Sequence, residues 1–451
     1  MIFQLNRLSQ WERPWLHRKN GNYKCPKKKV VKWFTEPHKT IHSVTVGART
    51  KIALTVFNPG SRTHIKIWLK RLFDIDSHYF TPAGNPKWSA DVFEELAEVE
   101  GDEHVKDSLL SMKRYLKNVK DSGFLHQGDN ALLRLYNPDT GAIHGRVDTL
   151  GTGTARATHS KPNMSQTPKA KEYRELFTAP EGYVVVGADQ AALEVRTLAH
   201  YLYKYDNGEY IDVVLNKDVH THNQEKAGLP TRSDAKVFFF AFLYGSGAVV
   251  RGVSLWSPEV ESTLEYKPKE RENIVKSIEN RALIINDKKY YPLKKDLMVE
   301  VNELLVLQGI YGAQVGQRFK DELVGLKELI EELSDYAEDK GHILSVDGRE
   351  IECSAGRYGL NYCLQSSGSI IVKQCMVNIQ DSLNATGMIY GIDYWQSGYY
   401  HDEVAFTVKK EHSETVRKIL EEASTPLQEQ FGLHLPFVAE GLIGDSWYDV
   451  H

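Results

Sequence analysis

The sequence predicts an α+β fold, and three observations support this prediction. An apolar run ends in Asp189, and two further apolar runs flank a turn at His401 and Asp402, which indicates a strand and a β-hairpin. Residues 232–244 and about 319–339 are expected to form long helices. Acidic residues that end separate strands can meet on one sheet, where they repel unless a divalent cation lies between them. Each acid taken alone is more commonly a solvated turn residue, so the metal site depends on agreement with the neighbouring motifs.

The length and composition predict a globular protein of two or three domains. The chain has 451 residues, of which 41% are hydrophobic. No apolar run approaches the roughly 20 residues of a membrane span, so we expect a cytoplasmic protein without a membrane partner. The four cysteines show no CxxC spacing, which argues against a disulfide framework or a zinc ribbon.

Positive charge is concentrated at the beginning of the chain. Residues 1–70 contain 15 lysines and arginines against 2 acidic residues, although the whole chain has a net charge of −4. A further basic run at helical spacing could follow a phosphate backbone, or could simply be a solvated helix face. This run comprises Lys113, Arg114, Lys117 and Lys120.

The other segments can be assigned in chain order. Residues 1–60 are expected to form loops and short strands, and residues 61–122 to form helices interrupted by the Pro- and Gly-containing loop at 81–86. Residues 123–168 are rich in turn residues. A helix is predicted to begin at Gln190, directly after the strand that ends in the first acidic residue.

The start of the helix at residues 232–244 has the most constrained pattern. Thr231 is placed to cap it, with Asp234 at the third helical position, and a helix start favours anions. Every fourth residue then lies on one stripe, which runs from two cations to two rings: Arg232, Lys236, Phe240 and Tyr244. Such a stripe could bind a triphosphate at its basic end and a sugar and base against its rings. The alternative is a helix with its rings in the core and its cations in solvent.

These motifs resemble those of family-A DNA polymerases, most closely the replicative polymerases of short-tailed bacteriophages. The resemblance covers roughly residues 57–451. Residues 189–196, 232–245 and 401–403 are similar, in order, to the first palm motif, the fingers helix and the last palm motif of the family. Two further segments also match, namely residues 154–168 and the pattern Arg357-xxx-Asn361-xxx-Gln365.

The resemblance implies a right-hand polymerase fold with an antiparallel palm sheet, helical fingers and a partial helical thumb. We expect the partial thumb, with its basic N-terminal segment, at residues 1–135. The palm would comprise residues 136–201 and 361–451, and the fingers residues 202–360. An insertion at about 248–309 does not align with the family.

The resemblance also implies template-directed addition of dNMPs to a primer 3′ end, with release of pyrophosphate by a two-metal mechanism. Asp189 and Asp402 would hold two Mg²⁺ ions, or Mn²⁺ in their place, together with a backbone group of Ala188 or Gln190. Glu403 would be a supporting acid of the catalytic site.

The nucleotide would contact the fingers helix and its surroundings. Arg232 and Lys236 would bind the β and γ phosphates, and Lys236 would also protonate the leaving group. His220 is a further expected phosphate contact. Glu194 would exclude a 2′-hydroxyl, and Tyr244 would flank the templating base pair.

Phe240 predicts how the enzyme treats dideoxynucleotides. The phage relatives often have tyrosine at this position, whose hydroxyl substitutes for the missing 3′-hydroxyl of a dideoxynucleotide. We therefore expect this chain to discriminate against dideoxynucleotides.

The resemblance also assigns residues to the DNA. The primer–template would be held by Arg156, Asn163, Gln166, Arg357, Asn361, Gln365 and His401. Ala155 departs from the family, which usually has glycine before the template-binding arginine.

We expect neither a 3′–5′ exonuclease domain nor a full thumb in this chain. A separate exonuclease or thumb-completing polypeptide is therefore a further hypothesis. Residues 1–56 loosely resemble the basic thumb insertion with which phage polymerases bind thioredoxin, which suggests a thioredoxin-like processivity factor. A truncated thumb edge is the alternative.

Three other classes of protein compete with a DNA polymerase. A single-subunit RNA polymerase-like nucleotidyltransferase shares the fold, but Glu194 and Glu403 favour deoxynucleotides. A two-metal nuclease could use the same aspartates without needing the stripe at 232–244. A binding protein without catalytic activity is disfavoured because every expected catalytic residue is present.

Overall fold

The structure is a computed structural model, which describes residues 56–77, 79–81, 83, 85–285, 288–295 and 297–450. The predictions for residues 1–55, including the thioredoxin-binding segment, lie outside these ranges. The chain divides into two compact units. One comprises Met1–Ser77 and Pro86–Leu116, and the other comprises His78–Asn85 and Lys117–His451.

The described part of the first unit is helical. It contains α2 (Arg62–Phe73), α3 (Ala90–Val99) and the first part of α4 (Glu103–Leu125). Ser61 caps α2 by accepting a hydrogen bond from the His64 backbone N–H, and Ser89 caps α3 in the same way. The predicted helices interrupted by a loop are thus confirmed.

The second unit is built on an antiparallel sheet with the strand order β12-β13-β6-β14. These strands are Tyr394–Tyr400, Glu403–Lys409, Tyr183–Gln190 and Ala439–Gly444. Successive side chains of β6 and β13 point to opposite faces of the sheet. On one face, Val186 and Phe406 are paired across the two strands and belong to the main hydrophobic core. The predicted strand and hairpin are confirmed, although β6 continues one residue beyond Asp189.

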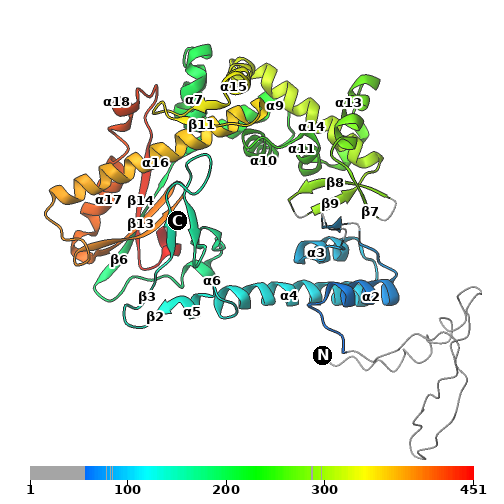
Figure 1. The fold of residues 1–451 in the computed structure, drawn as a ribbon, viewed down its shortest axis with the longest axis horizontal. Helices are drawn as coiled ribbons and strands as arrows, with labels where there is room; N and C mark the ends of the chain where they lie inside the picture. The colour runs from blue at the N-terminus through cyan, green and yellow to red at the C-terminus, as the bar shows by residue number, and fades with distance from the viewer. Residues whose placement is uncertain are drawn as a thin grey trace, which may run out of the picture. The chain divides into compact units, whose positions relative to one another are not determined.

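Helices α7 (Leu193–Asp206), α16 (Gly359–Ala385), α17 (Ser413–Glu422) and α18 (Leu427–Phe431) supply apolar side chains to the same core. Figure 1 shows α16 running alongside the sheet. The prediction that a helix begins at Gln190 is wrong, because Gln190 belongs to the strand. Ala192 has a left-handed φ of 52°, so helical geometry starts only at Leu193.

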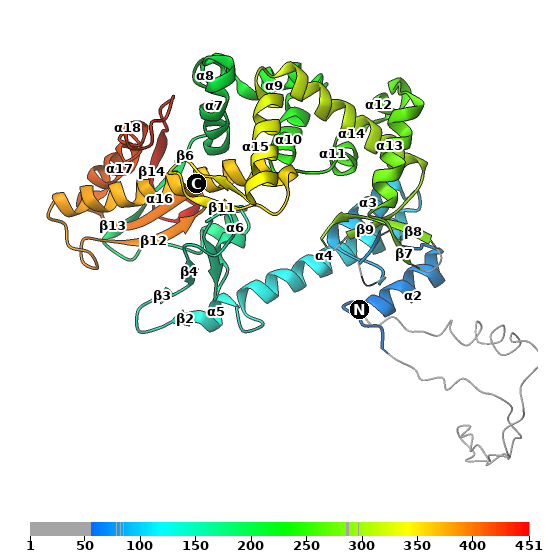
Figure 2. The same cartoon turned by 45° about the horizontal axis from the view of Figure 1, so that its top comes forward.

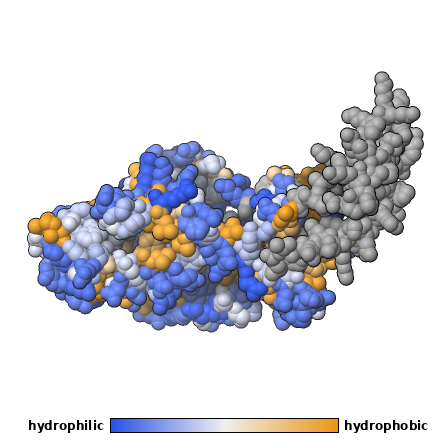
Figure 3. Space-filling model, turned by 90° about the horizontal axis from the view of Figure 1, so that it is seen from below, coloured by the Kyte–Doolittle hydropathy of each residue, from blue (hydrophilic) through white to orange (hydrophobic). Residues whose placement is uncertain are grey.

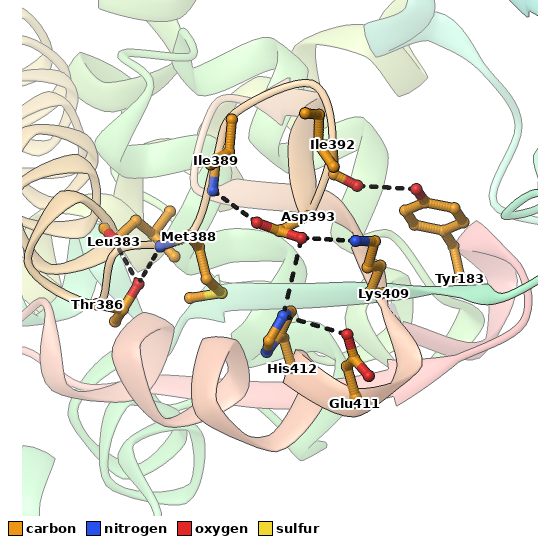
Figure 4. Close-up of polar contacts among 10 residues, drawn as sticks. All are labelled: Tyr183, Leu383, Thr386, Met388, Ile389, Ile392, Asp393, Lys409, Glu411 and His412. Carbon is orange, nitrogen blue, oxygen red and sulfur yellow. Dashed lines mark hydrogen bonds and ion pairs between the residues drawn. The ribbon is translucent and has the colours of Figure 1, made fainter.

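Asp393 fixes the end of this sheet where β6 begins (Figure 4). Its carboxylate accepts a hydrogen bond from the Ile389 backbone N–H at 2.7 Å and forms an ion pair with Lys409 at 2.7 Å. The Tyr183 hydroxyl donates to the Ile392 carbonyl at 2.8 Å. These contacts join β6, β13 and the turn before β12, and they help to set the register that determines which residues meet at the other end.

A helical region follows the sheet strand β6 and helix α7. It consists of α8 (Glu209–Asn216), α9 (Val219–Ala227), α10 (Arg232–Leu243), α14 (Glu303–Glu322) and α15 (Leu326–Lys340), which are best seen in Figure 2. The helix predicted at about 319–339 is confirmed over residues 326–339 by α15, but it begins later than predicted, and residues 319–322 belong to α14. The chain breaks between α14 and α15, where Gly325 has a φ of 81° that ordinary residues rarely adopt.

The described residues of the predicted insertion form helices and a small sheet with their own hydrophobic cluster. The insertion contains α11 (Ala248–Leu255), α12 (Pro258–Thr263), α13 (Pro268–Glu279) and the strands β7 (Leu283–Ile285), β8 (Lys288–Lys294) and β9 (Leu297–Glu300). Strand β1 (Tyr79–Phe80), which was not predicted, pairs with β9. A side chain at Gly252 would clash with α14, since its Cβ would lie 1.6 Å from the Gln308 carbonyl oxygen. The backbones of α11 and α14 are therefore in direct contact.

Short elements complete the fold. Strands β2 (Tyr136–Asn137) and β3 (Ala142–Ile143) form one small sheet, β4 (Arg146–Asp148) and β5 (Thr158–Ser160) another, and β10 (His342–Leu344) and β11 (Glu350–Glu352) a third. The short helices are α5 (Leu132–Leu135), α6 (Lys171–Arg174), η1 (Met164–Gln166), η2 (Gly356–Tyr358), η3 (Lys410–His412) and η4 (Trp447–Val450).

The surface has mixed polarity. The face in Figure 3 is mostly hydrophilic, with separate apolar areas between the polar ones. Within the described ranges, no helix combines the length and the apolar character needed to cross a membrane.

Candidate active site

The two predicted metal-binding acids lie at the same end of the sheet. Asp189 is the penultimate residue of β6, and Asp402 lies in the two-residue turn between β12 and β13. The Gln190 backbone N–H donates to the Asp402 carbonyl oxygen at 3.1 Å. His401, the other turn residue, has a φ of 63°, which gives the tight turn that two-residue hairpin loops require.

The electrostatics of this end of the sheet are unfavourable for free carboxylates. Burial, together with the charges of Asp402 and Glu403, raises the pKa of Asp189 to about 7. Burial and the nearby Glu194 carboxylate also raise the pKa of Asp402. A cation bound between the acids would relieve this repulsion, which favours the metal-site prediction over that of solvated turn residues.

Glu194 links the acids to the fingers-like helix α10. Its carboxylate accepts a hydrogen bond from the Tyr244 hydroxyl at 2.8 Å and another from the Arg156 guanidinium at 2.9 Å. The guanidinium also lies 5.9 Å from the centre of the Tyr244 ring. The structure therefore joins three residues from distant parts of the sequence: a predicted sugar-selecting acid, a predicted base-pair contact and a predicted DNA contact.

Helix α10 begins and presents its residues as predicted. The Thr231 hydroxyl accepts a hydrogen bond from the Asp234 backbone N–H at 3.0 Å. Arg232 and Lys236 are exposed, Phe240 is half-buried, and Tyr244 is 44% exposed. Other aromatic residues of this segment fill the core, namely Phe238, Phe239 and Phe242. The alternative is thus met only in part, because the cations of the stripe are exposed to solvent but its rings, Phe240 and Tyr244, are not among the buried core residues.

The basic end of the stripe already has a carboxylate partner. Two nitrogen atoms of Arg232 bind Asp218, with a shortest distance of 2.7 Å. The ring of His220 lies 6.1 Å from that of Phe240. Its Nδ1 is buried and has no hydrogen-bond partner among the described residues, so a ligand that reaches it would satisfy an unpaired group.

A cavity of about 460 Å³ opens beside the turn. Four residues predicted to bind DNA line it, namely Arg156, Asn163, Gln365 and His401. Gln365 accepts a hydrogen bond from the Thr154 hydroxyl at 3.3 Å. Burial and Arg156 lower the pKa of His401.

The structure places the other predicted DNA contacts outside the cavity lining. Asn361 is buried and donates from Nδ2 to the carbonyl oxygen of Leu243 at the end of α10. Arg357 is exposed and contacts the Tyr358 hydroxyl at 2.9 Å. Gln166 is exposed at the end of η1. Their roles stay predictions.

Comparison with known proteins assigns the family. Residues 29–255 match the family model described as DNA polymerase family A. The chain belongs to this family. It is 30% identical to the DNA-directed DNA polymerase of Enterobacteria phage T3, over 98% of this chain and 60% of that protein. It is also 30% identical to the DNA-directed DNA polymerase of Escherichia phage T7, over 96% of this chain and 58% of that protein.

A solved structure of the family has the same fold. The structure described as the POL domain of Pol1 from M. smegmatis in complex with DNA primer-template and dNTP superposes with a TM-score of 0.62. The two share 20% sequence identity, and the match covers 87% of this chain and 62% of that chain. The predicted α+β polymerase fold is therefore confirmed. The chain spans about 60% of the length of the phage relatives.

The residues present suit the divalent metal ions that family-A polymerases generally use. Two carboxylates with raised pKa values offer the hard oxygen ligands that Mg²⁺ prefers. No group of three or more His, Cys, Asp or Glu side chains arranged for a metal occurs among the described residues. Since Mg²⁺ is usually held by one or two carboxylates together with waters and substrate phosphates, two protein ligands suffice.

Several residues of this candidate site were not predicted from the sequence. His159 and Tyr362 line the cavity, and Asp218 binds Arg232. Arg174 and Trp447 both contact the buried Glu403. Asp218 carried a weak signal, because it directly precedes α9 as an N-cap residue. The other four residues come from segments far apart in the chain, and no local pattern marks them.

Proposed function

We propose that this chain is a template-directed DNA polymerase that adds dNMPs to a primer 3′ end and releases pyrophosphate. The observation that carries the proposal is the contact of Glu194 with Tyr244, which joins the acidic end of the sheet to the helix that bears Arg232 and Lys236. A reaction centre of this type needs both a metal-binding acid pair and a phosphate-binding helix.

Asp189 and Asp402 would hold two Mg²⁺ ions. When bound, these ions would activate the primer hydroxyl and neutralise charge on the triphosphate. Arg232 and Lys236 would bind the β and γ phosphates with charge-assisted hydrogen bonds, and Lys236 would donate a proton to the leaving pyrophosphate. Backbone coordination by Ala188 or Gln190 belongs to the same proposal.

The sugar of the nucleotide would lie against Glu194. Its carboxylate is held from two sides, by the Tyr244 hydroxyl and the Arg156 guanidinium, so it cannot move aside freely. A carboxylate fixed in this way would exclude a 2′-hydroxyl. Phe240 would lie beside the 3′ side of the sugar, where it offers no hydroxyl to a dideoxynucleotide.

The primer–template would pass the cavity beside His401. Its polar lining, which includes Arg156, Asn163 and Gln365, suits the phosphate backbone and the acceptors of the minor groove. The thumb, palm and fingers would then occupy the predicted ranges, with the palm at 136–201 and 361–451.

Primer extension tests the proposal. The purified chain should extend a primer–template with dNTPs and Mg²⁺, extend it poorly with rNTPs, and leave it intact when no nucleotide is present. Asp189→Ala and Asp402→Ala should each abolish extension, whereas Asp335→Ala, an exposed acid on α15, should not. Extension that survives both active-site substitutions would show that the metal assignment is wrong. Degradation without nucleotide would indicate a nuclease, and equal use of rNTPs an RNA polymerase-like enzyme.

A further inference from the structure

The segment that ends the described chain is hydrogen-bonded to residues 177–179, which lead into β6. The Trp447 backbone N–H donates to the Phe177 carbonyl oxygen at 2.9 Å, and the Ala179 N–H donates to the Asp445 carbonyl oxygen at 3.1 Å. Thr178 and Ser446 form an isolated antiparallel bridge at the same place. The short helix η4 is therefore held in place by backbone hydrogen bonds.

The Trp447 side chain is enclosed by three residues. Its ring stacks on Tyr400 at 4.6 Å with an interplanar angle of 27°, and it meets the edge of Phe177 at 5.6 Å. The Arg174 guanidinium lies 4.3 Å from the ring centre, within cation–π range. Trp447 is only 5% exposed. Its indole Nε1–H donates a hydrogen bond to Glu403 Oε1.

Arg174 binds the other oxygen of the same carboxylate. Its Nη1 lies 3.6 Å from Glu403 Oε2, and both side chains are buried. Arg174 Nε and Nη1 have no hydrogen-bond partner among the described residues. Trp447 thus contacts Oε1 of the Glu403 carboxylate, and Arg174 contacts Oε2.

This arrangement matters because Glu403 lies directly opposite Asp189. The two residues are paired across β13 and β6, and directly opposed residues of antiparallel strands project from the same face. Like charges opposite each other destabilise a sheet unless they are compensated. A Glu403 carboxylate released from Trp447 could therefore turn toward a cation held by Asp189 and Asp402, and bind it as a third acid.

We propose that Trp447 and Arg174 are positioning residues that hold Glu403 out of the metal site. The site then offers an ion two carboxylates and leaves its other coordination positions to the triphosphate and water. The inference rests on the proposed function, because it takes Asp189 and Asp402 as the metal ligands.

Trp447→Phe tests this proposal, because phenylalanine keeps an aromatic ring but removes the N–H donor. Mn²⁺ binding is measured by electron paramagnetic resonance on the protein without DNA or nucleotide. The variant should bind Mn²⁺ roughly fivefold more tightly, since affinity rises with the number of ligand charges. At saturating Mn²⁺ its kcat should fall about tenfold, because the added ligand displaces the triphosphate or water. A merely structural defect would weaken Mn²⁺ binding instead.

Two further variants complete the test. Trp395→Phe, on β12 with its ring against Tyr183, is the matched control and should leave Mn²⁺ affinity unchanged. Adding Glu403→Gln to Trp447→Phe should return the affinity to that of Glu403→Gln alone, since the third carboxylate is gone. If Trp447→Phe does not fold, Arg174→Lys makes the same test, because a lysine cannot both lie flat on the indole and reach Glu403.

The outcomes separate the two proposals. Unchanged or weaker Mn²⁺ binding by the folded Trp447→Phe or Arg174→Lys variant overturns the positioning role. So does a double variant that still binds Mn²⁺ more tightly than Glu403→Gln. If Asp189→Asn and Asp402→Asn leave Mn²⁺ binding intact, the metal site of the proposed function is wrong, whatever the tryptophan variant does.

Discussion

Under the proposed function, the ion pair between Arg232 and Asp218 predicts weaker binding of the nucleotide than the basic stripe alone would allow. Asp218 Oδ2 lies 2.7 Å from Arg232 Nη2, so an incoming triphosphate must compete with a carboxylate for the same guanidinium. Asp218→Asn removes the charge but keeps a side-chain oxygen, which can still cap α9 by accepting from the Thr221 backbone N–H. We expect the variant to have a lower KM for dNTP.

The exposure of the pair limits the size of this effect. The Arg232 and Asp218 side chains are 54% and 47% exposed, so water and salt screen their attraction. Exposed pairs contribute little, which corresponds to a fall in KM of at most about fivefold. Arg232 keeps the pKa of Asp218 well below its usual range, so the carboxylate stays charged near neutral pH. The ratio of the two KM values, for the parent and for Asp218→Asn, should therefore be the same in mildly acidic and mildly alkaline buffers.

Steady-state single-nucleotide extension at low and high salt is the assay. The decrease in KM should shrink as salt rises, and kcat should stay within about twofold. The matched control is Asp212→Asn, which removes an acid of α8 that forms an ion pair with Lys217. This variant should leave KM unchanged. A higher KM for Asp218→Asn would refute the competition. It would mean that Asp218 instead holds Arg232 ready for the phosphates.

Three other substitutions test the resemblance to phage polymerases, a helix contact and a buried histidine. Phe240→Tyr should relax the discrimination against dideoxynucleotides by supplying a hydroxyl, and equal use of both nucleotide types by the unmodified chain in a competition assay would contradict this. Gly312→Ala would bring a Cβ to 2.1 Å from a backbone oxygen of α11 and should lower the free energy of unfolding by about 3 kcal/mol or more. Gly123→Ala in α4, whose Cβ would meet nothing within 4 Å, should not lower it in the same urea titrations. Burial and the nearby His434 lower the pKa of His200 to about 4, below its ordinary 6.5. The folded state thus favours the neutral ring, and stability should fall as the pH drops from 6.5 towards 4, less steeply in His200→Asn than in the parent.

Much of the site could be predicted from local patterns. The cap at Thr231 and the four-residue spacing from Arg232 to Tyr244 are properties of one helix, and the structure has them as predicted. Asp189 and Asp402 were each predicted from an apolar run that leads into an acid, and the structure places them at the penultimate position of β6 and in the turn after β12. The errors have local causes of a different kind: Ala192 and Gly325 adopt left-handed φ values, which interrupt helices that hydrophobic spacing alone would continue.

Pairings between distant segments could not be predicted in this way. The register that sets Glu403 opposite Asp189 depends on hydrogen bonds between strands more than 200 residues apart. The addition of β1 to the insertion sheet likewise has no local signal, because a two-residue strand is too short to show alternation.

The resemblance of its motifs was enough to indicate the family. The sequence by itself also indicated the α+β class and the shared face of the stripe at 232–244, because spacing along one helix or strand dictates which side chains lie on the same side. The folded chain added their partners. Asp218 binds Arg232, Arg156 and Tyr244 hold Glu194, and Trp447 holds Glu403. The local sequence around each of these residues is compatible with many different polar partners. Only the packing of the whole sheet and its helices brings one particular partner within hydrogen-bond distance.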